Sequence, residues 1–286
     1  MAGEQSIIWI GNLNQAARRF LQRLFGRPQK NESTVPGLDD DAYTLFEGMD
    51  LRVQDLSVEP LEDLPFDPGS LPGAFRIRVA RTRDTSDQAS GLVKRRYASR
   101  GYQVPTAKAD PNLFTFVAYN SGDLVGTVSL RLDSPQGLSA DELYKAEVHN
   151  VRSKTTRICE FTRLAIDSRA GSKWALAGLF HTAYLFAHRV SACDVGIIEV
   201  NPRHVVFYER ALMFERIGPE RLSQRVKAPA VLLYVRFQTI ADGLAKYARK
   251  PELVNTTRSL FPYGFSAKDE EGILSRLREF SEATRR

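Results

Sequence analysis

The 286-residue chain contains few cysteine and histidine residues, and each shortage excludes a class of protein. Its two cysteines, Cys159 and Cys193, are too few for a disulfide-rich fold. Both lie in apolar segments, which indicates buried free thiols in a reducing compartment. The four histidines are scattered, and together with the cysteines they give no metal-ligand spacing. We therefore expect neither a disulfide framework nor a metal site.

Long apolar runs are also missing from the chain. No run reaches the roughly 20 residues that a membrane-spanning helix needs. The N-terminus lacks the basic stretch and apolar core of a secretory signal. With 43% hydrophobic and 26% charged residues, the composition is that of a globular protein. The sequence predicts a cytoplasmic protein, either free or peripheral to the inner membrane.

Charge is distributed very unevenly along the chain. Residues 37–70 carry ten acidic side chains and only Arg52, so this segment has a net charge of −9. Residues 1–36 have a net charge of +3, and the remainder has +12. A basic body favours an acidic partner, such as nucleic acid, anionic lipid or an acidic carrier protein. Nucleic acid is disfavoured because the basic residues lack interleaved aromatic side chains and a known reader motif.

The first 73 residues are expected to form an N-terminal extension. Residues 7–27 show the apolar spacing of an amphipathic helix with a basic face. Two interpretations of it remain open, a membrane-surface helix and a helix packed on its own domain or on a second copy. Residues 28–73 contain six prolines and the acidic block, which indicates an extended, poorly regular arm. Its apolar residues could dock on the basic body.

The rest of the chain alternates predicted strands and helices. Strands are expected at 75–80, 113–119, 124–132, 156–167, 195–200 and 230–237. Helices are expected at 86–101, 139–147, 172–190, 201–213, 238–248 and 267–284. Hairpin-linked strands followed by strand–helix–strand units predict an α/β protein of the α+β kind, with a mixed central sheet flanked by helices on both faces. We expect this domain over 74–238 and a helical C-terminal extension over 239–286.

Two segments combine charged residues with a structural boundary. On the strand at 156–167, Glu160 and Arg163 are three residues apart, so they point to opposite faces unless a bulge intervenes. The alternative is an ion pair that only closes the sheet. Residues 169–173 then enter a helix, whose N-terminus could hold a phosphate. Residues 199–208 lead from a strand into a helix and end at Tyr208, which is also compatible with a simple capped junction and a core tyrosine.

These residues carry a resemblance to a known family. Glu160-x-x-Arg163-Leu-Ala, then Glu199-Val-Asn-Pro-Arg-His-x-x-Phe-Tyr208, Ile217-Gly218 and Ala228-Pro-Ala-Val-Leu-Leu resemble N-acyl amino acid synthases of the FeeM type. That family lies in the GNAT acyltransferase superfamily and is related to acyl-homoserine-lactone autoinducer synthases, whose pattern Arg131-Leu132 also matches. The resemblance covers residues 75–237. It implies a GNAT-like fold and transfer of a long fatty acyl chain from a thioester to the amine of an amino acid.

The resemblance also implies roles for individual residues. Glu160 would be the general base or would position the amine, and Tyr208 would protonate the departing thiolate. Arg131 and Arg163 would bind the substrate carboxylate or orient Glu160, because a guanidinium grips a carboxylate with two hydrogen bonds. Further substrate contacts are expected from Glu199 and Asn201. The donor-binding residues would be Leu164, Ala165, Ile166, Arg169, Gly171, Ser172 and Lys173. The strands at 113–119 and 125–132 would line the acyl tail.

The expected donor is an acyl chain on the phosphopantetheine of acyl carrier protein, with acyl-coenzyme A as the alternative and no bound cofactor. The segment from Arg169 keeps one arginine and one glycine of the usual coenzyme A loop but breaks its spacing, and Trp174 is expected to crowd the pyrophosphate. An acidic carrier also suits the basic body. The other functions left open are a coenzyme A-dependent small-acyl N-acetyltransferase and a catalytically silent, membrane-docked binding module. The identity of the amino acid and the oligomeric state are not predicted.

Overall fold

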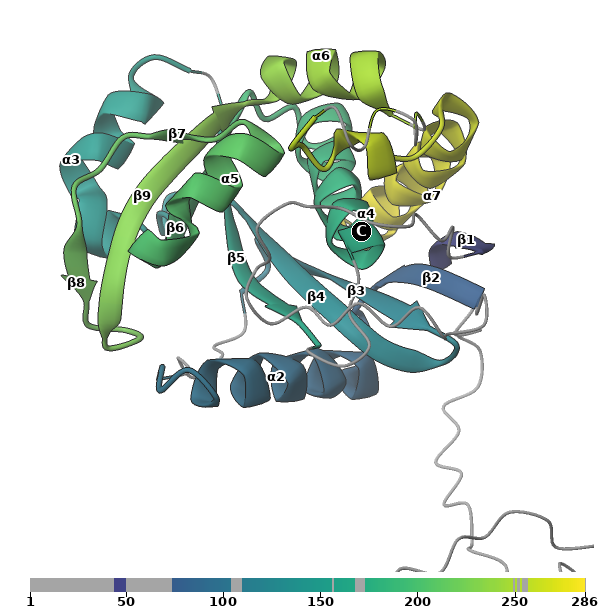
Figure 1. Cartoon of the computed structure of the whole chain (residues 1–286), viewed down its shortest axis with the longest axis horizontal. Helices are drawn as coiled ribbons and strands as arrows, with labels where there is room; N and C mark the ends of the chain where they lie inside the picture. Colours follow the sequence, from purple (N-terminus) through teal and green to yellow (C-terminus); the bar gives the residue numbers. More distant parts are fainter. Residues whose placement is uncertain are drawn as a thin grey trace, which may run out of the picture. The chain divides into compact units, whose positions relative to one another are not determined.

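The fold is built around one mixed sheet. The computed structural model describes residues 44–49, 74–103, 110–155, 157–167, 173–248, 250, 253 and 257–285. Within these residues nine strands pair in the order β1-β2-β3-β4-β5-β6-β9-β7, with β8 paired to β9 (Figure 1). The strands are β1 Thr44–Met49, β2 Ala74–Val79, β3 Leu113–Asn120, β4 Asp123–Leu132, β5 Ile158–Ile166, β6 Val195–Val200, β7 Glu215–Arg216, β8 Arg221–Ser223 and β9 Ala228–Arg236.

The pairing of β5 with β6 has the greatest consequence for function. It is parallel, whereas the other paired strands are antiparallel. The β5–β6 pairing runs from Ile158 opposite Val195 to Phe161 opposite Ile198 and then stops. β5 continues to Ile166 beside β4 alone, and β6 continues beside β9. The sheet therefore splays open between the ends of its two central strands.

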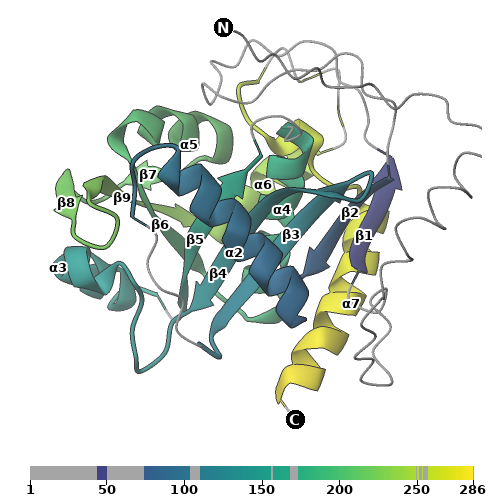
Figure 2. The same ribbon diagram turned by 90° about the horizontal axis from the view of Figure 1, so that it is seen from below.

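Helices cover both faces of the sheet, as the sequence predicted. On one face lie α2 (Arg83–Ala98) and α3 (Asp141–Arg152), and α2 packs Leu92 and Val93 against β5. Figures 1 and 2 show α4 on the side of the sheet opposite α2. The second layer consists of α4 Lys173–Tyr184, α5 Val205–Leu212, α6 Phe237–Tyr247 and α7 Ala267–Arg285. These four helices enclose the larger apolar core with the sheet.

Several local features differ from the prediction. The expected helix over 172–190 is α-helical to Tyr184 and then continues as a π-helical turn to Val190. The expected helix over 201–213 begins as a 3₁₀ turn, Pro202–His204, because the Asn201 side chain caps it and Pro202 sits in its first turn. The short strands β7 and β8 were not predicted. Two or three residues are too few to show an alternating pattern.

Strand β1 falls inside the arm that was expected to be irregular. Leu45 and Phe46 are buried, and the Phe46 ring packs 4.7 Å from that of Phe265, centroid to centroid. Docking of the arm's apolar residues is therefore confirmed at these two positions. The helix predicted over residues 7–27 lies outside the described residues, so membrane contact through it stays a prediction.

Both cysteines are buried and free, as predicted. Among the described residues, no helix combines the length and the apolar character needed to cross a bilayer.

Candidate active site

A bulge in β5 marks the place where the sheet opens. Thr127 of β4 lies opposite Ala165, but Ser129, two residues on, lies opposite Thr162, so β5 carries one extra residue there. Arg163 accommodates the bulge with a φ of 51°, in the left-handed region. Without a bulge, Glu160 and Arg163 would point to opposite faces of the sheet because they are three residues apart on one strand. The bulge removes this restriction, so both side chains can contribute to one site. It also displaces the backbone around Leu164 from regular pairing, beside the residues that have no partner on β6.

Glu160 is a buried carboxyl group on the face of the sheet covered by α3. Only 1% of the residue is exposed, and Oε2 accepts a 2.6 Å hydrogen bond from the backbone N–H of Ser139. Burial raises the pKa of this carboxyl, and the Ser139 hydrogen bond and the charges of Arg225 and Arg131 oppose that rise. Arg131 is its direct neighbour on β4. The carboxyl is thus desolvated but surrounded by groups that favour its charged form.

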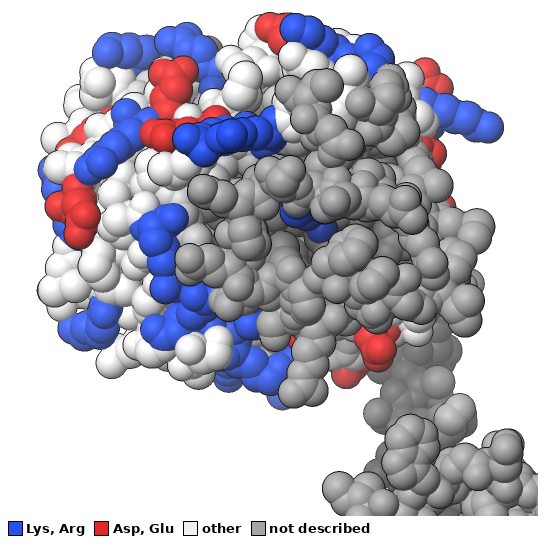
Figure 3. Space-filling view, in the orientation of Figure 1, with Lys and Arg blue, Asp and Glu red and all other residues white. Residues whose placement is uncertain are grey.

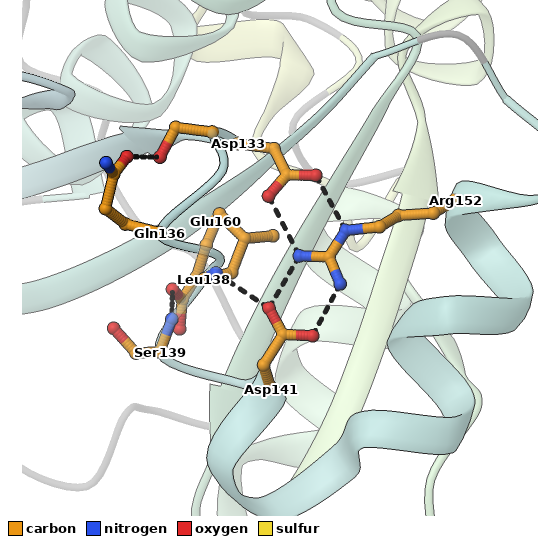
Figure 4. A network of polar contacts seen from close by, with 8 residues as sticks. Asp133, Gln136, Leu138, Ser139, Asp141, Arg152 and Glu160 are labelled. Atoms are coloured by element: carbon orange, nitrogen blue, oxygen red, sulfur yellow. Dashed lines mark hydrogen bonds and ion pairs between the residues drawn. The ribbon is translucent and has the colours of Figure 1, made fainter.

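The loop that carries Ser139 is held by an ion-pair clamp. Arg152 of α3 donates to both oxygens of Asp133 at 2.7 and 2.8 Å, and to both oxygens of Asp141 at 2.5 Å (Figure 4). Asp141 also accepts from the Leu138 backbone N–H at 2.7 Å. The arginine therefore ties the two ends of the loop together, and the Ser139 N–H is aimed at the buried carboxyl as a result.

Two guanidinium groups, those of Arg131 and Arg163, lie close to one another in this part of the sheet. Arg131 pairs through Nε with Asp110 at 2.9 Å and donates through Nη1 to the Ser139 hydroxyl at 2.8 Å. Arg163 is partly buried, and within the described residues its side chain has no ion pair or hydrogen bond. Burial and then the charge of Arg131 lower the pKa of the Arg163 guanidinium. Two like charges held close together in a partly buried place favour the binding of an anion.

Glu199 extends the same polar face along β6. Glu160 is the neighbour of Ile197, and Glu199 follows two residues later, so both carboxyl groups project to one side of the sheet. Glu199 forms an ion pair with Arg225, which also lies 3.4 Å from Glu142. Burial raises the pKa of Glu199 to about 7, and the charge of Glu160 adds to this rise. The two carboxyl groups therefore influence one another's ionisation.

Tyr208 lies across the sheet from these charges. It belongs to α5, is 5% exposed, and its ring packs against those of Phe180 and Phe214 at 6.2 and 5.8 Å between centroids. Burial raises its pKa well above the ordinary value. No hydrogen bond of its hydroxyl is present within the described part of the chain. The hydroxyl is thus a proton donor that stays protonated at neutral pH.

Tyr97 joins the two sides, and sequence reasoning missed it. It stands in the last turn of α2, and the charges of Arg163, Arg225 and Glu199 all act on its phenol. The same phenol raises the pKa of Tyr208. Tyr97 therefore lies at the opening, near charges from three elements and near α5. The only sequence signal for Tyr97 was its position in the last turn of α2, the helix before the β3–β4 hairpin.

Ser139 and Arg225 were missed for a different reason. Both act from loops, Ser139 through a backbone N–H and Arg225 from the turn between β8 and β9. A backbone donor leaves no mark in the sequence. The loop that follows α2 meets that turn, since the Gln103 N–H donates to the Val226 carbonyl at 3.1 Å. Tyr102 accepts a 2.9 Å hydrogen bond from Arg203, which holds the same loop against the start of α5.

The remaining predicted site residues are distributed as follows. Both hydrogen bonds of the Asn201 side chain go to backbone groups, at Arg203 and Pro229, which is a capping role. Leu164, Ala165 and Ile166 lie on β5 beyond the end of its pairing with β6. Lys173 is the first residue of α4, whereas Arg169, Gly171 and Ser172 lie outside the described residues. The Trp174 ring is buried against Phe75, so the expectation that it crowds a pyrophosphate gains no support.

An apolar cavity lies on the α4 side of the sheet. It is lined by Phe161, Ala177, Phe180, His181, Tyr184, Leu212, Phe214, Ile240, Leu244, Leu260, Phe261 and Gly264. None of these residues comes from β3 or β4, the strands expected to receive an acyl tail. The inward side chains of those strands, such as Phe116 and Val128, are completely buried in the core. Two of the cavity walls, Phe180 and Phe214, are the residues that contact the Tyr208 ring.

Together these features form a site for polar chemistry beside an apolar cavity. The site offers a buried carboxyl, a partly buried guanidinium without a partner among the described residues, and a neutral phenol on the other side of a split sheet. Within the described ranges no cluster of residues could hold a metal ion. Such a set can take a proton from one group, give a proton to another and bind an anion.

The chain is similar in sequence and in fold to known acyltransferases. The family profile described as N-acyl amino acid synthase FeeM matches residues 88–236, which is more than half of the chain. The structure of FeeM, an N-acyl amino acid synthase from uncultured soil microbes, is similar at 26% identity and a TM-score of 0.54, over 58% of this chain and 93% of that one. No curated protein sequence matches the chain.

Two other solved structures are less similar. An acyl-CoA N-acyltransferase from Pseudomonas aeruginosa has 14% identity and a TM-score of 0.40, over 56% of this chain and 98% of that one. The autoinducer (AHL) synthase LasI has 14% identity and a TM-score of 0.38, over 58% of this chain and 91% of that one.

Proposed function

The chain belongs to the FeeM family of N-acyl amino acid synthases and is an N-acyltransferase with a GNAT-like fold, and on this premise we propose that it transfers a long fatty acyl chain from acyl carrier protein to the amine of an amino acid. The observation that carries the proposal is that β5 holds a buried carboxyl and, beyond the end of its pairing with β6, a guanidinium that has no ion pair among the described residues. A buried carboxyl at Glu160 and a partly buried guanidinium at Arg163 suit the ammonium and the carboxylate of one zwitterionic amino acid.

The amine must lose a proton before it attacks the thioester. Glu160 accepts this proton, directly or through water, and its raised pKa makes it a stronger base than an exposed carboxylate. Glu199, on the same face of the sheet, adds negative charge that attracts the ammonium. Arg163, assisted by Arg131, holds the carboxylate, so the amine nitrogen is directed toward the open ends of β5 and β6.

The thioester is proposed to lie between those ends. The amine nitrogen attacks the carbonyl carbon, and backbone N–H groups near Leu164 stabilise the resulting oxyanion. The nitrogen of the tetrahedral intermediate loses its second proton as the carbon–sulfur bond breaks and the amide forms. The thiolate takes a proton from the Tyr208 hydroxyl, and the tyrosinate is reprotonated by the proton released from nitrogen, through solvent. This assignment places the base and the acid on opposite sides of the sheet, with the reacting carbonyl between them.

Surface charge supports an acidic carrier protein as the acyl donor. Figure 3 shows Lys and Arg side chains gathered over α2 on the face seen in Figure 1. Lys94 and Arg95 are exposed in the last turns of α2, directly before Tyr97 at the opening. A carrier bound there would extend its phosphopantetheine arm toward the splay, and long-range attraction would speed its association.

The reaction is tested by mass spectrometry of lipid extracts from cells that express the wild type or Glu160→Gln. New N-acyl amino acids in the wild type alone are the expected result, and their masses give the head group and chain length. A folded wild type that makes no such lipid would overturn the proposal.

The donor is tested with purified protein and the same acyl chain on acyl carrier protein or on coenzyme A. We expect Lys94→Glu/Arg95→Glu to raise KM for the carrier-bound donor by about tenfold or more and to leave a short pantetheine thioester unaffected. Lys268→Glu/Arg278→Glu on α7 makes the same charge change on the other face and serves as the matched control. A higher kcat/KM with the coenzyme A donor than with the carrier-bound donor, with no effect of charge reversal, would overturn the carrier as donor and favour coenzyme A.

A further inference from the structure

Arg131 lies between two carboxyl groups and pairs with only one of them. On one side its direct cross-strand neighbour is Glu160 of β5. On the other side its neighbour is Leu113 of β3, and Asp110 comes three residues before that strand begins. Nε of Arg131 lies 2.9 Å from Oδ2 of Asp110, whereas Glu160 has no ion pair among the described residues. Opposite charges at directly opposed positions of a sheet attract one another, so the pairing with Asp110 rather than Glu160 has a cause in the structure.

We propose that Asp110 is a positioning residue: its carboxylate holds the Arg131 guanidinium away from Glu160 and so leaves that carboxyl free to act as a base. The inference rests on the proposed function, because it takes the role of Glu160 as base from it. Two contacts support it, one that orients the Asp110 carboxylate and one that bridges Arg131 and Glu160 through Ser139.

The Asp110 carboxylate is oriented by the backbone. Its Oδ1 accepts a 2.9 Å hydrogen bond from the Asn112 N–H, which leaves Oδ2 for Arg131. Asn112 is in turn tied to β4, since its carbonyl accepts a 2.9 Å hydrogen bond from the N–H of Leu132, the residue after Arg131. The open end of the β3–β4 hairpin therefore holds the carboxylate and the guanidinium beside one another.

Ser139 bridges Arg131 and Glu160. Its hydroxyl accepts a 2.8 Å hydrogen bond from Nη1 of Arg131, and its backbone N–H donates one of 2.6 Å to Oε2 of Glu160 (Figure 4). The guanidinium thus uses Nε on Asp110 and Nη1 on Ser139, and it acts on the Glu160 carboxyl through its charge. A direct ion pair would favour the charged form of the carboxyl more strongly and make it a weaker base.

Other charged groups also face the Glu160 carboxyl. Arg225, from the turn between β8 and β9, lowers its pKa, but that guanidinium pairs with Glu199 on β6 and lies 3.4 Å from Glu142 on α3. Glu199 acts in the opposite sense, because two neighbouring carboxyl groups resist being charged together. Each of the two arginines whose charge acts on Glu160 is therefore bound to a different carboxylate.

The test measures the pKa of the Glu160 carboxyl by carbon-13 NMR in the purified full-length protein without substrate, with Glu160→Gln to identify its signal. Asp110→Asn keeps an acceptor for the Asn112 N–H but loses the charge that holds Arg131. We expect Arg131 then to pair with Glu160 and the pKa of that carboxyl to fall by about one unit or more. The acidic limb of kcat/KM should move to lower pH by the same amount, and kcat should fall by about three- to tenfold, because the base is weaker.

Loss of a negative charge could also lower the pKa of Glu160 without any movement of Arg131, so the same change is made in Arg131→Met. Asp110→Asn should have little further effect in that background, whereas a shift of equal size would show a direct effect of the charge and overturn the inference. An unchanged pKa in Asp110→Asn alone would also overturn it. Glu47→Gln, which breaks the ion pair with Arg76 between β1 and β2, is the matched control and should leave the pKa and kcat unchanged.

The pKa measurement does not depend on turnover. If Asp110→Asn lowers the pKa of Glu160 in a protein that forms no N-acyl amino acid, the positioning by Asp110 stands and the proposed function falls. If N-acyl amino acids form and the pKa does not move, the proposed function stands and the positioning by Asp110 falls.

Discussion

The backbone N–H of Ser139 donates a 2.6 Å hydrogen bond to Oε2 of Glu160, and it does so from a loop that the Arg152 clamp holds in place. Burial raises the pKa of the Glu160 carboxyl, and the hydrogen bond from Ser139 lowers it. The position and basicity of Glu160 therefore depend on residues outside its own strand.

Replacing Glu160 by glutamine should lower the rate of N-acyl transfer by about a hundredfold or more, because the amine loses its proton acceptor. The fold should be retained, since a glutamine carbonyl still accepts the Ser139 hydrogen bond. Steady-state kinetics and thermal unfolding measure the two effects. Glu147→Gln, which removes a carboxylate paired with Arg221, is the control and should leave kcat unchanged. Full activity of Glu160→Gln would exclude this residue as the base.

Glu199 should shape the pH dependence of kcat/KM. The pKa of Glu199 is raised to about 7, and its ionisation is coupled to that of Glu160. We therefore expect an acidic limb in the pH profile, in which kcat/KM falls below neutral pH as this pair of carboxyl groups becomes protonated. In Glu199→Gln the remaining carboxyl loses a neighbour of like charge, so the limb should move to lower pH by about one unit. A limb that does not move would show that the two carboxyl groups titrate independently.

The same raised pKa has a consequence for stability. Ionisation of Glu199 is disfavoured in the folded state, so its contribution to stability falls as pH rises through the interval from its ordinary value of 4.5 to about 7. The melting temperature of Glu199→Gln relative to wild type should therefore increase across this interval and stay level above it. Thermal unfolding at a series of pH values measures the difference. A decreasing difference would contradict the assignment.

Arg152→Met should test the clamp. It removes hydrogen bonds to two carboxylates and leaves Asp133 and Asp141 unpaired, which should lower the free energy of unfolding by about 2 kcal/mol. It should also lower kcat, because the Ser139 N–H is no longer aimed at Glu160. Urea unfolding and kinetics measure both.

Arg221→Met is the matched control for Arg152→Met. Arg221 also binds a carboxylate of α3, Glu147, with two hydrogen bonds and donates to the Leu143 carbonyl, but it does not touch the loop of Ser139. We expect comparable destabilisation with an unchanged kcat. An equal loss of kcat in both variants would mean that stability alone accounts for the effect.

Tyr208→Phe should slow transfer from pantetheine thioesters by about ten- to a hundredfold, because the departing thiolate then lacks its proton donor. A thioester with an acidic aryl thiol leaves without protonation, so the variant should regain most of the wild-type rate with it. Tyr263→Phe removes another buried hydroxyl without a partner among the described residues and should have neither effect. Equal slowing with both thioesters would assign Tyr208 a packing role.

Arg163 allows backbone and side chain to be tested separately. Its φ of 51° suits glycine, so Arg163→Gly should keep the bulge, whereas Arg163→Ala should be less stable than Arg163→Gly by about 1 kcal/mol. Both should raise KM for the amino acid by about tenfold or more, since both lose the guanidinium. If only Arg163→Ala raised KM, the bulge rather than the charge would be responsible.

Much of the fold was predictable because its signals are local. The strand at 195–200 and the helix near 267–284 follow directly from residue periodicity, and the structure confirms both. The residues of the candidate site that were predicted, such as Glu160 and Tyr208, stand in patterns that the family shares. Strand β1 was not predicted, because its pairing with β2 depends on a surface that the rest of the chain builds.

The parts of the site that escaped prediction act at a distance in sequence. Ser139 contributes a backbone donor 21 residues before its partner Glu160, and Tyr97 lies near Tyr208 although more than a hundred positions separate them. The cavity walls from α6 and the segment Leu260–Gly264 meet the core only in three dimensions. The spacing of apolar residues predicts which side chains share a face of one helix or strand. It does not predict which helices and strands pack against one another.

The contact between Arg276 and Leu45 has a consequence for how the protein is made. Nε of Arg276, on α7, donates a 2.9 Å hydrogen bond to the Leu45 carbonyl on β1, across 231 positions of sequence. During synthesis β1 leaves the ribosome long before the helix that covers it, so the first strand of the sheet stays uncovered until α7 has emerged. A ribosome stalled before residue 267 would thus hold a chain with an exposed sheet edge, which is a natural target for a chaperone.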